Sequence, residues 1–228
     1  MTIEEKFIYA GPSWANSSFP DDEYSTNLAK EWKIPCIDAS GHGDSCLDTL
    51  AKVLSILKDK KLPVIWIYNE PISDSEALIG CDHFSFIGSN DWKQLHADCN
   101  AQVLRRINDL GVPVLLIGGH CDIYDCDYPN LTVGHPSWQK WLAAQAGMTV
   151  ENNIIDFTPT NGGNYKLDFC WGPEVFHRII NDNQQLKPSA ELLDSIWDIY
   201  YFWQELERRD WFFEVHPNKK ATWNLLNF

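Results

Sequence analysis

The stretch FIYAGPSWANS (residues 7–17) joins a short apolar run to a sharp turn. The run at 7–10 is typical of a buried strand, and the Gly-Pro pair after it is a strong turn signal. Ser13 therefore stands just past the carboxyl end of the predicted strand. In open α/β folds, ligands bind at this end of the strands.

The same strand-then-helix pattern repeats along the first two-thirds of the chain. Strands are predicted at 6–10, 34–39, 63–68, 112–118 and, more weakly, 152–157, and helices at 22–32, 44–61, 91–110 and 136–146. This alternation predicts a parallel sheet covered on both faces, and right-handed crossovers make it a doubly wound α/β/α sandwich of about five strands. The final third is predicted to be helical at 172–183, 189–208 and 217–226. We expect a single domain over residues 1–228.

Composition narrows the classes of function. The 228 residues are 44% hydrophobic and carry a net charge of −14, which argues against nucleic acid or an anionic membrane as the main partner. No apolar run approaches the roughly 18 residues that a membrane span needs. The amino terminus, MTIEEKF, lacks the apolar core of a signal peptide. Seven cysteines without a CxxC pair favour reduced thiols, so we expect a cytoplasmic protein.

Four residues at predicted strand ends and near the carboxyl terminus suit acyl transfer. This chemistry needs a hydroxyl nucleophile, a base and donors to the oxyanion. Ser13 suits the nucleophile and His216, in EVHPN, suits the base. The oxyanion donors would be the Ser13 N–H, the side-chain amide of Asn69 in IYNEP, and the N–H of Gly43 in GHGDS, with Gly41 as the alternative glycine.

These residues, in this order, resemble the SGNH or GDSL-like hydrolases, which are named for a Ser, a Gly, an Asn and a His in separate blocks. Ser13, Gly43, Asn69 and His216 correspond to the four. The resemblance implies a flavodoxin-like three-layer sandwich and a carboxylic-ester hydrolase, such as an acetylesterase, that works through an acyl-enzyme without a cofactor. Small-molecule or carbohydrate esters are the implied substrates. Such a compact, acidic chain suits a bacterial or phage protein.

Two positions depart from the family pattern. Pro12 precedes the serine where the family has Asp, and Phe213 stands three residues before His216, where the family has the Asp that orients the imidazole. The carboxylates nearest to His216 are Glu214 and Asp210. Losing the orienting Asp costs about 10⁴ in kcat in a well-studied protease triad. The alternative is therefore a binding or structural protein that keeps the fold without turnover.

Two further motifs permit other interpretations. Strand-Asn-Glu-Pro is also the acid/base signature of glycosidases on (β/α)₈ barrels, with Glu70 as the acid, but that fold needs eight units and only about five are predicted. The stretch GGHCDIYDCD (118–127) matches no metal-binding spacing, so we expect a loop at the edge of the active site. His120 and Asp122 from this loop, with Trp14 and Glu70, are the candidates for lining the pocket, and no metal is expected.

Overall fold

The computed structural model describes residues 5–16, 32–68, 71–80, 92–119, 121–151, 154–160, 162–168, 190–213 and 216–221. The predicted helices at 22–32 and 172–183 lie outside these residues except for Trp32, as does the second half of the predicted helix at 217–226. Asn69, Glu70, His120 and Glu214 also lie outside them.

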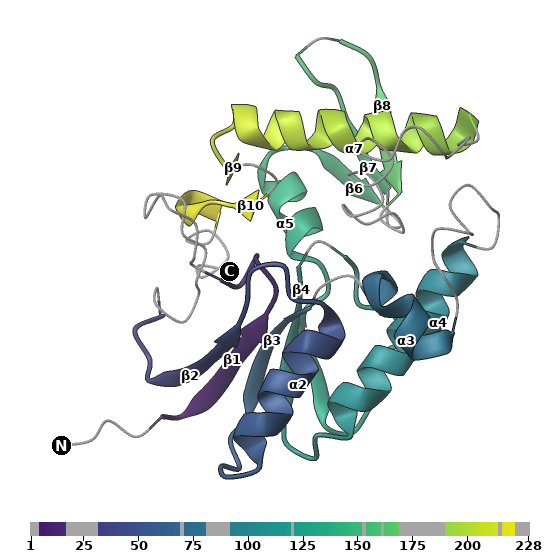
Figure 1. Cartoon of the computed structure of the whole chain (residues 1–228). Helices are drawn as coiled ribbons and strands as arrows, with labels where there is room; N and C mark the ends of the chain where they lie inside the picture. Colours follow the sequence, from purple (N-terminus) through teal and green to yellow (C-terminus); the bar gives the residue numbers. More distant parts are fainter. Residues whose placement is uncertain are drawn as a thin grey trace.

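An open parallel sheet of five strands forms the centre of the fold (Figure 1). The strands are β1 (Phe7–Gly11), β2 (Cys36–Ser40), β3 (Val64–Tyr68), β4 (Val114–Gly118) and β5 (Leu131–His135). Their order is β2-β1-β3-β4-β5, and all neighbouring pairs are parallel. The order reverses between β1 and β3, which is the switch point where doubly wound folds bind ligands. The predicted fold class is confirmed.

The inner strands have apolar residues on both faces because helices cover both sides of the sheet. Ile8, Trp66 and Leu116 pack into one hydrophobic cluster with α2 (Cys46–Leu57) and α4 (Trp92–Asn108). Tyr9, Ile67 and Ile117 pack on the other side into a cluster with α5 (Trp138–Gln145) and α7 (Ala190–Arg208). The three layers thus follow from continuous apolar runs rather than from alternating patterns.

The fifth strand is not the one that the sequence predicted. The predicted strand at 152–157 is observed as β7 (Ile154–Phe157), but it belongs to a separate antiparallel sheet with β6 (Thr149–Glu151) and β8 (Tyr165–Asp168). The fifth strand of the main sheet is β5, with the sequence LTVGH. As an edge strand it has exposed residues at Thr132 and Gly134, so it lacks the apolar run that marks a buried strand.

The start of α2 illustrates how the polar residues after the strands set the helix boundaries. The Ser45 hydroxyl accepts a hydrogen bond from the Asp48 backbone N–H at 3.2 Å, and the Asp48 carboxylate accepts one from the Ser45 N–H at 3.1 Å. This is a capping box, in which two otherwise unsatisfied donors at the helix start are satisfied reciprocally. It fixes the position of the GHGDS loop at the end of β2.

Short elements complete the described chain. A 3₁₀ turn, η2 (Pro71–Asp74), leads into α3 (Ser75–Ile79), and β9 (Phe212–Phe213) pairs antiparallel with β10 (His216–Pro217). In Figure 1, β9 and β10 lie beyond the end of the sheet at which the parallel strands finish. None of the helices in the described ranges is both long enough and apolar enough to cross a membrane.

Candidate active site

The candidate nucleophile, Ser13, stands in a single helical turn directly after β1. Gly11 has a φ of 149°, and a Cβ atom there would lie 2.8 Å from the Ile67 carbonyl oxygen, so only glycine allows β1 to approach β3 this closely. Pro12 then begins the turn, since its carbonyl accepts from the Ala15 N–H at 2.8 Å. The Gly-Pro pair thus ends the strand and leaves Ser13 half-buried at the switch point.

Trp14 lies beneath this turn in the core. Its side chain is 2% exposed and meets the Trp138 ring edge-on, with 5.6 Å between the ring centroids. The sequence suggested Trp14 as a residue that lines a pocket. The structure places it where it supports the Ser13 turn against the first residue of α5.

The two candidate glycines after β2 differ in what their backbones do. The N–H of Gly41 donates to the carbonyl of Gly11 at 3.0 Å, which ties the end of β2 to the end of β1. Gly43 is exposed, has a φ of 73°, and has no atom within 4 Å of the position where a Cβ would lie. The N–H of Gly41 is therefore already engaged, whereas the space around Gly43 is open.

A polar network that sequence reasoning missed joins the serine turn to β2. The Asn16 amide donates to the Ser40 hydroxyl at 3.4 Å, and Ser40 donates to an Asp38 carboxylate oxygen from both its N–H, at 2.9 Å, and its hydroxyl, at 2.5 Å. Asn16 is three residues after Ser13, which is one turn of a helix. The only signal in the sequence was the short run of polar residues after Ser13.

β3 ends at Tyr68, directly before Asn69, and hydrogen bonds hold this end of the strand in place. Tyr68, the last residue of β3, is fully buried, and its hydroxyl donates to the Asn100 side-chain oxygen on α4 at 2.8 Å. Burial raises the pKa of Tyr68 well above its usual value, so the phenol stays neutral. Its carbonyl accepts from the Gly119 N–H at 2.9 Å. The end of β3, directly before Asn69, is thus tied to both α4 and the end of β4.

The predicted loop after β4 brings a buried ion pair to the same end of the sheet. Asp122 is 4% exposed and pairs with Lys140 of α5, whose side chain is 14% exposed. Among the described residues, no three His, Cys, Asp or Glu side chains are arranged to hold a metal ion. The Asp122 carboxylate is thus engaged by an ammonium group at the start of α5.

His216 stands in a short strand rather than in the loop that the sequence predicted. It pairs with Phe213 in the β9–β10 ladder, so the residue at the family's Asp position lies opposite the histidine on the backbone. Asp210 is 74% exposed and its carboxylate lies 4.0 Å from Lys220, at the end of the turn that closes α7. The Asp210 carboxylate therefore faces a lysine at the surface.

Asn218 explains the His-Pro-Asn sequence in structural terms. Its side chain is 3% exposed, donates to the Asp210 carbonyl at 2.7 Å and accepts from the Ala221 N–H at 3.1 Å. One amide thus caps the helical turn at 219–221 and ties it to the end of α7. Ala221 belongs to the same hydrophobic cluster as Trp14 and Ala15, so the closing helical turn and the serine turn share one core.

Comparison with known proteins adds two structures. Neither a protein-family model nor a curated protein matches the chain. The structure is similar to that of TesA, at 14% identity and a TM-score of 0.35, over 90% of this chain and 99% of TesA. It is also similar to that of YxiM from Bacillus subtilis, at 11% identity and a TM-score of 0.38. That match covers 99% of this chain, which spans 55% of the YxiM chain.

The strand order β2-β1-β3-β4-β5 is the flavodoxin-like order that the resemblance to the SGNH hydrolases implied. The same order excludes the barrel interpretation of Asn69 and Glu70, because the main sheet is open and five-stranded rather than closed from eight strands.

Proposed function

We propose that this chain is a serine ester hydrolase of the SGNH type, with Ser13 as the nucleophile and His216 as the base. The position of Ser13 carries the proposal. It is half-buried in the turn after β1, where the strand order reverses and where ligands bind in doubly wound folds.

The reaction proceeds in two steps. The Ser13 oxygen bonds to the ester carbonyl carbon while His216 takes the hydroxyl proton, and the alcohol then leaves with that proton. Water attacks the acyl-enzyme, His216 accepts a proton from it, and the proton returns to the Ser13 oxygen as the acid is released. Neither step needs a cofactor.

The oxyanion is stabilised by the N–H groups of Ser13 and Gly43 and by the Asn69 side-chain amide. Gly43 is preferred to Gly41 because the Gly41 N–H already donates to the Gly11 carbonyl. The hydrogen bonds that hold Tyr68 support this assignment, since they fix the strand end from which Asn69 extends.

Glu214 is the better candidate for orienting the imidazole. Asp210 is 74% exposed, and its carboxylate lies 4.0 Å from Lys220. A carboxylate two residues before the histidine takes the place of the family's aspartate, whose position Phe213 occupies. The substrate is an ester of a small molecule or a carbohydrate, and a short acyl group such as acetyl suits the half-buried serine.

The test is covalent labelling with a fluorophosphonate and turnover of a short-chain p-nitrophenyl ester. We expect wild type to be labelled, and Ser13→Ala to lose both labelling and at least about 10³-fold in kcat. Ser55→Ala is the matched control, since Ser55 is an exposed residue of α2, and it retains both. Neither labelling nor turnover of wild type between about pH 6 and 9 would overturn the proposal.

One observation favours a second function of another class. Phe213 pairs with His216, so an aromatic residue occupies the position at which the family orients its imidazole. A protein that binds an ester or glycan without cleaving it would keep the fold and lose this carboxylate. Glu214→Gln separates the two: it lowers kcat in the hydrolase and changes nothing in a binding protein.

A further inference from the structure

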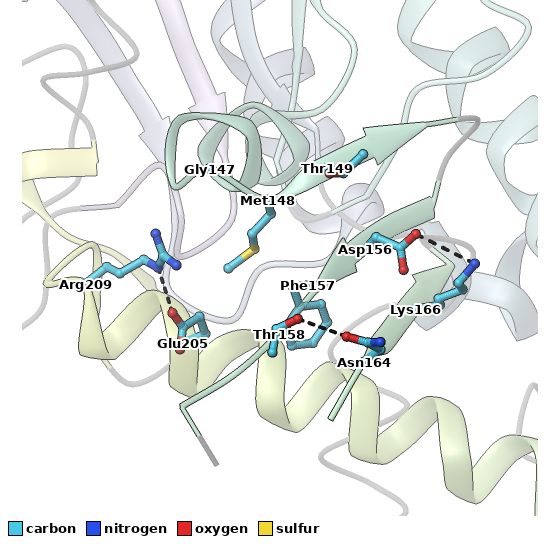
Figure 2. Close-up of a pocket in the computed structure, with 10 residues that line it drawn as sticks. All are labelled: Gly147, Met148, Thr149, Asp156, Phe157, Thr158, Asn164, Lys166, Glu205 and Arg209. Atoms are coloured by element: carbon cyan, nitrogen blue, oxygen red, sulfur yellow. Dashed lines mark hydrogen bonds and ion pairs between the residues drawn. The ribbon is translucent and has the colours of Figure 1, made fainter. Parts of the chain in front are cut away.

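A cavity of about 530 Å³ lies where the β6–β7–β8 sheet meets α7 (Figure 2). Its volume falls within the range of small-ligand sites. It is lined by Gly147, Met148, Thr149, Asp156, Phe157, Thr158, Asn164, Lys166, Glu205 and Arg209. None of the residues assigned to ester hydrolysis is among them.

Helix α5 separates this cavity from the serine turn. The helix starts at Trp138, which contacts Trp14, and ends at Gln145, two residues before Gly147 in the cavity wall. Its eight residues rise about 12 Å. The cavity and Ser13 therefore lie near opposite ends of one helix, and a ligand in the cavity leaves the serine open.

The charges in the cavity wall cancel in pairs. The Glu205 carboxylate is 2% exposed and accepts hydrogen bonds from Arg208 at 2.6 Å and from Arg209 at 2.8 Å. These hydrogen bonds lower the pKa of Glu205, and the one from Arg208 has the largest effect. Arg209 also donates to the carbonyl of Ala146. Lys166 lies 3.7 Å from Asp156, its cross-strand neighbour. The four charged residues that line the cavity, Asp156, Lys166, Glu205 and Arg209, therefore have no net charge to attract an ion.

Neutral polar groups remain available around an apolar centre. The Thr158 hydroxyl donates to the Asn164 side-chain oxygen at 3.1 Å, which leaves the Asn164 amide hydrogens without a partner among the described residues. The exposed Thr149 side chain likewise has no hydrogen-bond partner among the described residues. Figure 2 shows Met148 and Phe157 between the Glu205–Arg209 pair and the Asp156–Lys166 pair. The cavity thus combines apolar surface with hydroxyl and amide groups.

A ladder of aromatic rings leads from the cavity wall to the surface. Phe157 stacks on Tyr165 at 5.6 Å with 26° between the ring planes, and Tyr165 meets Tyr201 of α7 at 4.6 Å. Tyr201 in turn lies 6.1 Å from Trp197, which is 53% exposed. The exposed Trp197 ring therefore offers apolar surface to a ligand at the outer end of the ladder.

We propose that this cavity and its aromatic ladder bind a neutral saccharide. The C–H face of a pyranose ring carries partial positive charge and packs against the negative face of an aromatic ring. Its hydroxyls pair with the Asn164 amide, the Thr149 hydroxyl and the outer atoms of the ion pairs. The balanced charges disfavour a phosphate or a uronate. This site goes beyond ester hydrolysis and does not depend on it.

The experiment is calorimetric titration of the full chain carrying Ser13→Ala, so that no ester cleavage contributes. The probes are neutral hexasaccharides of glucose, mannose, xylose and N-acetylglucosamine, with hexagalacturonate as the charged comparison. We expect at least one neutral probe to bind, and Trp197→Ala and Asn164→Ala each to weaken its binding by about tenfold. Leu54→Ala is the matched control, since Leu54 is 46% exposed on α2, and it leaves binding unchanged.

Three results would overturn the proposal: no saturable heat with any neutral probe up to about 10 mM, equal affinity in all variants, or tighter binding of hexagalacturonate. Thermal melting of each variant shows whether it is folded, so a loss of binding is not confused with unfolding. Binding with an inactive wild type would refute only the hydrolase, and hydrolysis without binding would refute only the saccharide site.

Discussion

At the scale of single residues, His96 on α4 is a buried histidine with a strongly shifted pKa. The side chain is 2% exposed, its ring meets that of Tyr124 at 6.1 Å, and its Nε2 atom has no hydrogen-bond partner among the described residues. Burial lowers its pKa from 6.5 to about 4. Without a partner to stabilise the imidazolium, the folded protein holds this residue neutral.

This shift predicts a loss of stability in acid. The unfolded chain takes up a proton at His96 below pH 6.5 and the folded protein only near pH 4, so the free energy of unfolding falls as pH falls through that window. We expect His96 to contribute about 3 kcal/mol to the loss between pH 7 and pH 4. Urea unfolding of wild type and His96→Gln at several pH values measures it. The variant should show the shallower dependence, and identical slopes would contradict the prediction.

Single residues also show how much of the candidate site could be predicted from the sequence. Ser13 was identifiable because a serine after an apolar run and a Gly-Pro turn must stand at a strand end. The link from Asn16 to Ser40 was not identifiable, because it joins residues that are 24 apart and only the pairing of β1 with β2 brings them together. The burial of Trp14 was not identifiable for a similar reason, since it depends on Trp138 from α5.

At the scale of elements, long periodic segments were predicted well and short edge strands were not. The observed bounds lie within four residues of the predicted ones for β1 to β4 and for helices α2, α4, α5 and α7. These elements were predictable because continuous apolar runs and helical periodicity are visible in the local sequence. β5 was missed since two of its five residues are exposed to solvent. β6 and β8 were missed because three- and four-residue strands carry too little pattern to be told from loops.

The turn between α7 and the closing helical turn offers a test of how His216 is positioned. Asn218→Ala removes both the cap on the Ala221 N–H and the bond to the Asp210 carbonyl, and we expect a loss of about 1–2 kcal/mol of stability. Because β10 ends one residue before Asn218, His216 should also lose its fixed position. On the proposed mechanism kcat falls about tenfold while KM changes little.

The control for this test is Lys220→Ala. Lys220 is exposed and contacts the same turn, at 3.2 Å from the Arg209 carbonyl and 4.0 Å from the Asp210 carboxylate. It should leave both stability and kcat nearly unchanged, as a surface ion pair contributes little. A fall in stability in Asn218→Ala without any change in kcat would show that the turn does not position the histidine.

At the scale of the whole molecule, the candidate active site and the cavity lie in different parts of the fold. The carboxyl ends of β1, β2 and β3 carry the candidate ester-cleaving residues, whereas the layer of α5, α7 and the small antiparallel sheet carries the cavity. The opposite layer, α2 and α4, contributes only packing among the residues that the structure describes. We therefore expect that layer to behave as a structural unit whose integrity reports on global folding.

The cysteines provide a direct measurement of this unit. Cys46, Cys99 and Cys121 are at most 1% exposed and come from α2, α4 and the segment after β4, while Cys36 and Cys126 are half-buried. None of these five forms a disulfide. Burial raises the pKa of Cys36 and of Cys126, so even the more accessible thiols are mostly protonated near pH 7.

We expect the three buried thiols to react only when the molecule unfolds as a whole. In a Cys81→Ser, Cys170→Ser variant, which keeps only the described cysteines, Cys36 and Cys126 should react slowly with a maleimide in buffer alone. Cys46, Cys99 and Cys121 should share one much slower rate that rises with urea as global unfolding does, because each lies in the same closely packed layer. Peptide mass spectrometry after timed labelling gives the five rates separately. Three unequal rates that do not respond to urea would mean that α2, α4 and the segment after β4 open independently, and that the layer is not one cooperative unit.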